Sequence, residues 1–497
     1  MVTQSLLAEV SVHRLDDGRA PIGGVISRRT VLGSLAILTG AIALAACGST
    51  PAGAPATPAS TASLGAASAS ARMNAGSSAA PTAAPTAASQ TAASTKAVTL
   101  TWLASRSALE VPVWQGMADA YNRTHASVTV NYLNDPAGWQ QKLTALMAAG
   151  TGPDIVRLES NGFTDLVRKS YFLSLDPYVQ KASSLDLPDF FSQALEAFKV
   201  QGKQYAMPMV LSSLVMNYNR RLLSEAGVSV PAAGWTWNDY LQLSQSLTKA
   251  GSAGTDQWGT TWETNTLIRA VAFVWQNGGE LFDQQYSKAA LDQAPAVEAF
   301  TFLTDMFYKW HVAPTPADLA SAKRSMDQLF TDQKIATRIT GPWNRGIYNQ
   351  AKDLDWDVIP LPKGKDSDVT PLFVGGYPIT TQSKQPDDAW DLVQFLTSKD
   401  SAPAWAKVGT SSPARKSAAS SSAFLSEAGP PKNAKVYVDY AAQSGRPSPD
   451  FAGYVDVGKT IEDQLAPMWQ GKIAPQEALT KAAPVVNALL QKEGGQQ

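Results

Sequence analysis

The segment from residue 48 to residue 96 constrains the fold most, because almost none of it can contribute to a hydrophobic core. Of its 49 residues, 43 are Ala, Ser, Thr, Gly or Pro. Such a segment cannot bury enough apolar surface to offset the entropy lost on ordering, so we expect a disordered linker. The folded part is then residues 97–497, a length that is too large for one comfortable core and predicts two lobes.

An uncharged, apolar segment precedes this linker. Arg28 and Arg29 stand just before residues 31–46, which carry no charge. In a helix these 16 residues would span roughly 24 Å, which is short of a bilayer crossing. Basic residues, a short apolar run and then small residues are the order of a cleavable export signal, so we predict a signal peptide over residues 1–46.

The only cysteine of the chain, Cys47, stands where this signal ends. It follows Leu44-Ala45-Ala46, and the four residues resemble the lipobox of bacterial lipoproteins. The two arginines likewise resemble the signal of the twin-arginine export route. The resemblance implies that Cys47 becomes the lipid-bearing N-terminus of the mature protein. We therefore expect residues 47–96 to tether the folded part to the outer face of the cytoplasmic membrane.

The charge balance and the scarcity of metal-binding residues exclude several classes of function. There are 41 basic and 42 acidic residues, so the chain supplies no basic surface for nucleic acid. One cysteine permits no internal disulfide and no thiolate cluster for zinc or iron–sulfur. The three histidines, His13, His125 and His311, are far apart in the sequence. We therefore expect no metal site and no cofactor.

The apolar pattern after residue 97 alternates between strands and helices. Residues 98–103, 128–132 and 154–158 are short β-branched or apolar runs that predict strands. Between them, residues 113–123 and 139–149 carry apolar residues at helical spacing. Strands that alternate with helices predict a parallel α/β sheet. The same pattern restarts later in the chain.

Several segments of the folded part together resemble family 1 of the extracellular solute-binding proteins of ABC importers, which includes sugar-binding proteins. No single segment is specific, but they occur in the family's order and at its approximate spacing. They are Gly150–Val156, Met216–Gly227, Trp235–Leu241, Ile335–Trp343, Asp355–Pro362, Val374–Ile379 and Asp387–Leu396. The resemblance covers essentially all of residues 97–497.

The resemblance implies an α/β, two-lobed periplasmic-binding-protein-like fold of type II, with the ligand in a cleft between lobes joined by crossover hinges. The crossovers are expected near residues 207–213, 373–377 and 409–415. The first lobe would comprise residues 97–210 and 373–412, and the second lobe residues 211–372 and 413–497. Closure of the lobes on the ligand would create the form that a permease recognises.

Aromatic residues are the first candidates for the cleft. Trp343 follows Gly341-Pro342 at the end of a predicted strand, and the resemblance implies that it stacks on a sugar. Gly375 and Gly376 would allow close backbone approach and a positive φ at a crossover. The remaining candidates of this kind, or beside them in sequence, are Tyr377, Trp262 and Glu263.

Polar residues at the ends of the first-lobe strands should also face the cleft, because open α/β sheets bind ligands there. Side chains of these types suit the recognition of hydroxyl groups. A solvated loop is the alternative for each of them. The candidates are Arg106, Asn134, Asp135, Glu159 and Asn161, together with Ser212 and Arg415 near the crossovers.

The resemblance implies a monomeric receptor, not an enzyme, that delivers a sugar or oligosaccharide to an ABC permease. Two alternatives stay open. A tethered glycoside hydrolase would need two carboxyl groups, for which Glu159 and Glu263 are the candidates. A binding protein of the same fold could instead take up a polyamine, ferric ion or a sugar phosphate, the last through Arg106 and Arg415.

Overall fold

The computed structural model describes residues 98–135, 139–252 and 254–494. The predicted signal peptide, Cys47 and the linker up to residue 96 lie outside these residues. Within the described part, no helix is both long enough and apolar enough to cross a membrane.

A three-stranded parallel sheet begins the folded part. Its central strand, β1 (Val98–Ala104), pairs with β2 (Val128–Asn134) on one side and β3 (Ile155–Val156) on the other. Two helices, α1 (Val111–Thr124) and α2 (Trp139–Ala148), connect these strands. The predicted order of elements and the predicted parallel sheet are therefore confirmed.

The helix α1 shows why the sequence folds this way locally. It buries Trp114, Met117, Ala118 and Tyr121, which are spaced so that they share one helical face. That face packs on β2. A proline in the first turn, Pro112, suits a position where the backbone N–H has no partner within the helix.

The predicted strand over residues 154–158 is divided in the structure. Ile155 and Val156 pair with β1, but β4 (Leu158–Glu159) pairs antiparallel with β13 (Thr370–Pro378). Arg157 stands between the two strands, where the chain leaves one sheet for the other.

The sheet β2–β1–β3 and the helices packed on it are called the first lobe below. The elements between β4 and residue 213 are α3 (Phe163–Arg168), α4 (Asp176–Lys181), η1 (Ser183–Leu185), η2 (Leu187–Asp189), α5 (Ser192–Glu196), β5 (Lys199–Val200), β6 (Lys203–Gln204) and β7 (Ala206–Ser213). Later in the chain, α13 (Pro386–Leu396) and α14 (Ala402–Ala406) return to pack on α1.

A five-stranded mixed sheet forms the centre of what we call the second lobe. Its strand order is β12–β8–β11–β10–β9, and only β10 and β11 pair in parallel. The strands are β8 (Val215–Asn219), β9 (Lys249–Gly251), β10 (Gly254–Thr261), β11 (Ile335–Thr340) and β12 (Trp356–Ile359). The helices between them are α6 (Arg220–Glu225), α7 (Trp237–Leu247), η3 (Thr266–Ala270), α8 (Val271–Gln276), α9 (Ala294–Tyr308), α10 (Pro316–Ala322), α11 (Met326–Thr331), η4 (Pro342–Asn344) and α12 (Arg345–Gln350).

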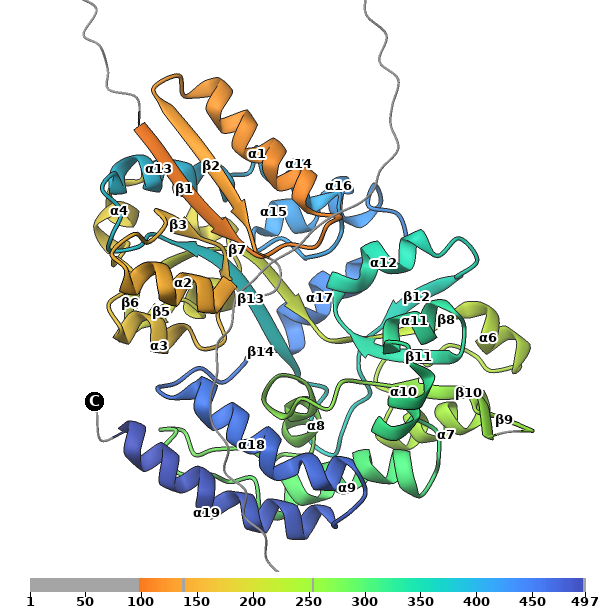
Figure 1. Cartoon of the computed structure of the whole chain (residues 1–497). Helices are drawn as coiled ribbons and strands as arrows, with labels where there is room; N and C mark the ends of the chain where they lie inside the picture. The colour runs from red at the N-terminus through yellow and green to blue at the C-terminus, as the bar shows by residue number, and fades with distance from the viewer. Residues whose placement is uncertain (1–97, 136–138, 253, 495–497) are drawn as a thin grey trace, which may run out of the picture. The chain divides into compact units, whose positions relative to one another are not determined.

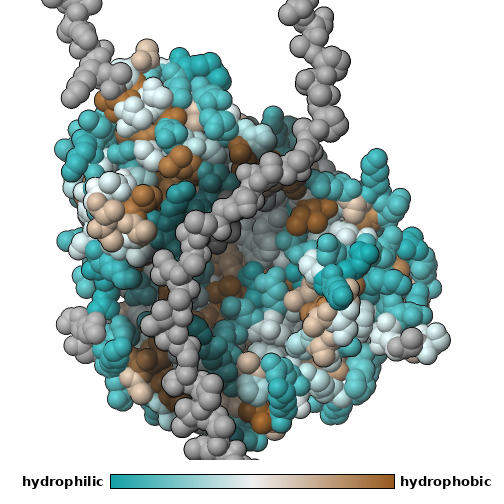
Figure 2. All heavy atoms as spheres, viewed as in Figure 1, coloured by the Kyte–Doolittle hydropathy of each residue, from teal (hydrophilic) through white to brown (hydrophobic). Residues whose placement is uncertain are grey.

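The C-terminal elements mostly extend the second lobe. The long helices α18 (Tyr454–Trp469) and α19 (Pro475–Gly494) pack on each other, on η3 and on α9. Before them come α15 (Lys416–Ala419), α16 (Ser422–Leu425), α17 (Lys435–Ser444) and β14 (Gly445–Pro447). Hydrophilic side chains cover much of the face drawn in Figure 2, with hydrophobic residues in small separate patches.

Two long strands, β7 and β13, run between the two sheets (Figure 1). They pair antiparallel from Ala206↔Pro378 to Ser213↔Leu372. A third segment joins them, because Leu211 N donates to Ser412 O at 2.9 Å and Ala414 N to Met209 O at 2.8 Å. We call these three paired segments the hinge ladder. They coincide with the three segments in which crossovers were expected.

Gly375 and Gly376 lie within β13, and neither has a positive φ. The prediction of positive φ at these positions is therefore wrong. The predicted close approach is confirmed, because a Cβ on Gly375 would lie 2.3 Å from Arg157 Nη2 and one on Gly376 would lie 2.6 Å from Met207 O. Gly375 thus gives the guanidinium of Arg157 room to lie across the strand.

Candidate ligand-binding site

A cavity of about 420 Å³ lies where the first lobe, the second lobe and the hinge ladder meet. This volume falls within the range of roughly 300–1,000 Å³ that is typical of small-molecule sites. The first lobe contributes Arg106, Glu110, Trp139, Gln140, Arg157, Glu159 and Asn161, the second lobe Ile268, Arg269 and Trp343, and the hinge ladder and the loop before its third segment Val210, Ser212, Phe373, Thr410 and Ser411.

The first-lobe wall begins at the carboxyl end of β1 with a paired arginine and glutamate. Arg106 is 7% exposed, and its Nη1 lies 3.5 Å from Glu110 Oε1. The guanidinium also lies over the ring of Trp114, 4.6 Å from its centre. Burial disfavours the charge of Glu110, but Arg106 and hydrogen bonds from Ser107 and Thr410 outweigh burial and lower its pKa.

A second ion pair stands beside the first. Arg157 Nη1 donates to Glu159 Oε1, and Arg157 is only 6% exposed. The Glu159 side chain is 43% exposed, although its Oε2 atom is buried. Among the described residues, neither Arg157 Nε nor Glu159 Oε2 has a hydrogen-bond partner. A buried donor and a buried acceptor without partners are costly, so this wall is suited to a ligand that satisfies both.

The opposite wall is aromatic. The rings of Trp343 and Phe373 meet edge to face, with their centres 4.9 Å apart. The guanidinium of Arg269 lies over both rings, 4.8 Å from the centre of Trp343 and 4.6 Å from that of Phe373. Trp343 is half-buried, so part of its indole surface remains free for a ligand.

Gly341 determines where the indole of Trp343 lies. A Cβ at Gly341 would stand 2.1 Å from Cζ3 of that ring, closer than any real contact. The φ of Gly341 is −107°, which other residues adopt freely. The glycine is therefore required for space and not for its backbone conformation.

A chain of alternating charges lies behind this wall. Arg269 Nε donates to Glu263 Oε2 at 3.0 Å, and Glu263 Oε1 lies 3.2 Å from Nη2 of the buried Arg338. Arg338 Nε in turn donates to Asp327 Oδ1 at 2.6 Å. Burial opposes the charge of Glu263, but the two arginines outweigh it and lower its pKa. The chain fixes the orientation of Arg269.

Five of the predicted site residues line the cavity, and two more hold lining residues in place. Glu263 orients Arg269, and Asn134 accepts from the backbone N of Arg106 at 2.8 Å and donates to its carbonyl at 3.1 Å. The five that line the cavity are Arg106, Glu159, Asn161, Ser212 and Trp343.

The structure places four other predicted residues outside this cavity. Trp262 is buried and stacks on Phe307, with ring centres 4.8 Å apart. Tyr377 is fully buried, and its ring packs edge to face on Trp102. Gly376 lies within the hinge ladder, next to Phe198. The Oδ2 atom of Asp135 lies 3.5 Å from Lys142 Nζ in an ion pair.

Arg415 also lies away from the cavity, for a physical reason. Its guanidinium donates to the backbone oxygens of Thr397 at 2.5 Å and Leu185 at 2.9 Å, and lies 3.3 Å from the Asp189 carboxylate. It also lies 4.0 Å from the ring centre of Phe190. Arg415 is thus fully engaged in joining chain segments that are distant in the sequence.

The sequence analysis missed several lining residues. Arg157 carried a usable signal, because it precedes the candidate Glu159 by two residues at the same strand end. Arg269 carried none, since η3, on which it lies, has no recognisable pattern. The other missed residues are Glu110, Gln140, Val210, Ile268, Phe373, Thr410 and Ser411.

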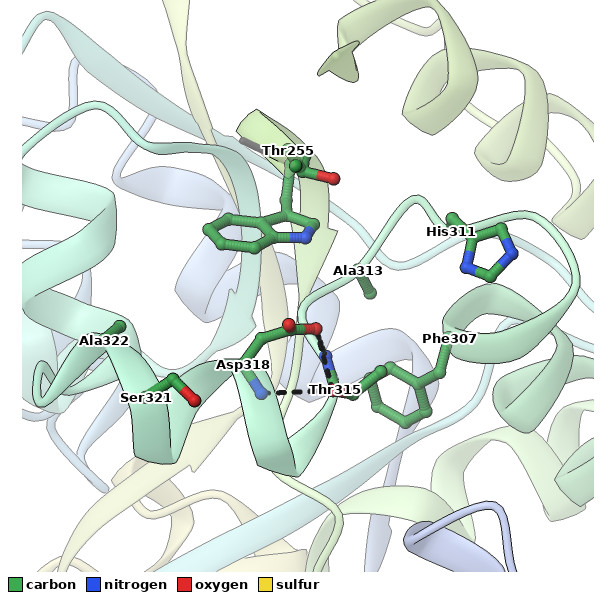
Figure 3. A pocket seen from close by; sticks show the side chains of 10 residues that line it. Thr255, Phe307, His311, Ala313, Thr315, Asp318, Ser321 and Ala322 are labelled. Carbon is green, nitrogen blue, oxygen red and sulfur yellow. Dashed lines mark hydrogen bonds between the residues drawn. The ribbon is translucent and has the colours of Figure 1, made fainter. Parts of the chain in front are cut away.

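Another cavity, of about 530 Å³, lies within residues 254–322 (Figure 3). Two of its polar side chains are already paired, because Thr315 and Asp318 cap the N-terminus of α10 through reciprocal hydrogen bonds. It contacts only the second lobe, whereas the cavity at the hinge ladder has walls from both. Among the described residues, no cluster of His, Cys, Asp and Glu could hold a metal ion.

Comparisons with known proteins agree with this arrangement. The galactooligosaccharide-binding protein of Bacillus subtilis (strain 168) is 24% identical over 400 residues, 76% of this chain and 89% of that protein. An ABC substrate-binding protein of Listeria monocytogenes, solved in complex with cycloalternan, superposes with a TM-score of 0.72 at 25% identity, covering 79% of this chain and 99% of that one. The GacH receptor of Streptomyces glaucescens, solved unliganded and with acarbose, superposes with a TM-score of 0.68 at 22% identity. The match covers 80% of this chain and 99% of that receptor.

The fold of these structures confirms the two-lobed α/β architecture expected from the sequence. The model of one protein family, described as bacterial extracellular solute-binding protein, matches residues 107–403. That match spans more than half of the chain, and the protein therefore belongs to the family of bacterial extracellular solute-binding proteins.

Proposed function

We propose that this protein captures a sugar or oligosaccharide in the cavity at the hinge ladder and delivers it to an ABC importer. Relatives support the ligand class, since their descriptions name galactooligosaccharides, cycloalternan and acarbose. The observation that carries the proposal is the composition of the cavity, in which an aromatic wall faces a wall of paired polar groups.

Each wall suits one side of a carbohydrate. A pyranose ring has apolar C–H faces, and the exposed part of the Trp343 indole offers a flat apolar surface for such a face. The hydroxyl groups at the ring edge need hydrogen-bond partners, and Arg157 and Glu159 each carry one buried polar atom without a partner among the described residues, a donor and an acceptor. Asn161 and Ser212 add neutral polar groups to the same cavity.

Lobe closure is the proposed means of capture. A ligand that contacts Trp343 on one lobe and Glu159 on the other favours the conformation that brings both walls together. We propose that the first lobe comprises residues 97–210 and 373–412, and the second lobe residues 211–372 and 413–497. The closed form would then present a surface to the permease subunits.

Two carboxylates of the site support binding over hydrolysis. A glycoside hydrolase needs a general acid, a carboxyl group whose pKa is raised. The pKa values of Glu110 and Glu263 are lowered instead, because arginines outweigh the effect of burial. We therefore propose that the ligand leaves the site chemically unchanged.

A binding screen tests this function. Calorimetric titration with glucose, maltotriose, mannobiose and galactobiose should give saturable binding to at least one of them. A ligand at 100 times its Kd should also stabilise the native state by about 2.7 kcal/mol in thermal unfolding. Chromatography of the ligand after overnight incubation should show no new product. Consumption of the sugar would establish the hydrolase instead, and binding of only a polyamine or ferric ion would remove the carbohydrate proposal.

Anchoring belongs to the same proposal. Lipidation of Cys47 would keep the receptor beside its permease, at the end of a linker with a root-mean-square reach of roughly 35–42 Å. A Cys47→Ala variant should appear in the soluble fraction or the medium, whereas the unmodified sequence should sediment with membranes. Equal membrane association of both would contradict the anchor.

A further inference from the structure

The cavity walls carry balanced charge. Three arginines line the cavity, and each is paired with a carboxylate: Arg106 with Glu110 at 3.5 Å, Arg157 with Glu159, and Arg269 with Glu263 at 3.0 Å. Ion pairs of this kind leave little net field at the ligand position, because each positive charge has a negative charge within one hydrogen-bond length or slightly more.

The balance continues behind the aromatic wall. Glu263 also contacts Arg338, but Arg338 is paired with Asp327, so the four-residue chain has no net charge. The lowered pKa values of Glu110 and Glu263 keep these two carboxylates ionised at neutral pH. Each arginine that lines this cavity is therefore already paired with a carboxylate, so its positive charge is not available to bind an anion.

The hydrogen-bonding capacity of the walls, in contrast, is not exhausted. Arg157 Nε can donate and Glu159 Oε2 can accept, and both are buried without a partner among the described residues. They belong to side chains that are joined by an ion pair and that both line the cavity. A hydroxyl group can both donate and accept, and two neighbouring hydroxyl groups can satisfy both atoms.

Charged ligands match this pair poorly. A carboxylate or phosphate only accepts, so it could bond to Arg157 but would be repelled by Glu159. An ammonium group only donates and would meet Arg157. In either case the ligand would lose its hydration without finding a free counter-charge. The Arg157–Glu159 pair thus favours neutral over charged ligands, because it repels either sign of charge as well as attracting hydroxyl groups.

We infer that the site selects neutral, polyhydroxylated ligands over sugar acids, sugar phosphates and amino sugars, and that Arg157 and Glu159 together read two neighbouring hydroxyl groups. The inference rests on the proposed function and narrows its ligand class.

The first experiment compares neutral and charged carbohydrates on the same protein. Calorimetry would measure Kd for glucose, maltotriose, mannobiose, galactobiose, glucuronic acid, galacturonic acid, glucose 6-phosphate and glucosamine. We expect a neutral member to bind at least tenfold more tightly than every charged member. If a charged member binds as tightly or more tightly, the inference fails while carbohydrate binding stands. If none of these carbohydrates binds, the proposed function fails and the inference fails with it.

The second experiment removes the negative half of the pair. Glu159→Gln keeps the size and one acceptor oxygen but leaves the charge of Arg157 unmatched. We expect at least a tenfold loss of affinity for the best neutral carbohydrate, together with a gain for its acidic counterpart. Glu225→Gln is the matched control, because Glu225 is similarly exposed and paired with an arginine, Arg221, away from the cavity.

Unchanged affinities in Glu159→Gln would show that Glu159 does not contact the ligand and would overturn the inference. A uniform loss for neutral and acidic carbohydrates, without a change in their ratio, would overturn it as well. Thermal unfolding would verify that the variant is folded. The first experiment does not depend on that outcome, since it uses the unmodified sequence.

Discussion

At the scale of single residues, glycines make room for two of the side chains that line the cavity. Gly341 provides the space in which the indole of Trp343 lies, and Gly375 provides the space for the guanidinium of Arg157. The sequence analysis expected a positive φ at position 375, but the structure shows that this glycine is needed for space. The space at Gly375 is set by Arg157, which is distant in the sequence, so local sequence does not reveal that partner.

We predict that Gly341→Ala weakens carbohydrate binding at least tenfold while leaving the fold intact. The added Cβ would stand 2.1 Å from the indole, and the movable ring would have to turn out of position. Trp343→Ala should reduce binding at least as much, because it removes the ring itself. Calorimetric titration and thermal unfolding of both variants measure the two effects separately.

A matched glycine controls for the substitution itself. A Cβ on Gly116, in the middle of α1, would meet nothing within 4 Å, so Gly116→Ala should bind normally and be stabilised by roughly 0.5–1 kcal/mol. Normal binding by Gly341→Ala would mean that the ring position does not matter to the ligand.

At the scale of elements, periodic patterns were reliable guides. A capping box begins α7, since Thr236 Oγ1 accepts from Asp239 N and Asp239 Oδ2 accepts from Thr236 N at 2.7 Å. These hydrogen bonds lower the pKa of Asp239. The strands β1 and β2 and the helices α1 and α2 lie close to their predicted ranges. Such elements follow from spacing and caps, which are local properties of the sequence.

Elements with few residues were predictable only in part. The strand expected over residues 154–158 is divided because Leu158 and Glu159 pair with β13, more than 200 residues later in the chain. The residues that line the cavity were likewise predictable only in part. Strand ends in the first lobe nominated Arg106 and Glu159, which line the cavity, but Arg269 and Phe373 reach it through packing between distant segments. Arg415 was nominated by its nearness to a hinge segment in sequence, and tertiary contacts direct it elsewhere.

At the scale of the whole molecule, a carboxylate joins the first lobe to the segment before α18. Asp450 accepts hydrogen bonds from Gly162 N at 2.8 Å, Thr164 N at 2.9 Å and Thr164 Oγ1 at 2.8 Å. In return, Asp165 Oδ1 accepts from Gly453 N at 2.7 Å. Because α18 packs on the second lobe, these contacts bridge the two lobes near Asn161, which lines the cavity.

The protonation of Asp450 should therefore affect stability. Burial raises the pKa of Asp450 to about 7, although the three hydrogen bonds favour its charged form, and nearby Asp165 raises it further. An unfolded aspartate has a pKa of about 3.9, so the folded state holds the extra proton between the two values. The stabilisation is complete below pH about 4 and is lost as the pH rises towards about 7, at no more than about 1.4 kcal/mol per pH unit.

We predict that Asp450→Asn flattens the dependence of stability on pH between about 4 and 7. The amide keeps the shape and one acceptor oxygen but cannot titrate in this range, so the difference in unfolding free energy between pH 5 and pH 8 should shrink. Urea denaturation at both values measures that difference. Asp165→Asn, in the same contact, is the control and should retain more of the pH dependence than Asp450→Asn, because the burial that chiefly raises the pKa of Asp450 remains. If Asp450→Asn keeps the full pH dependence, Asp450 is not the titrating group of this bridge.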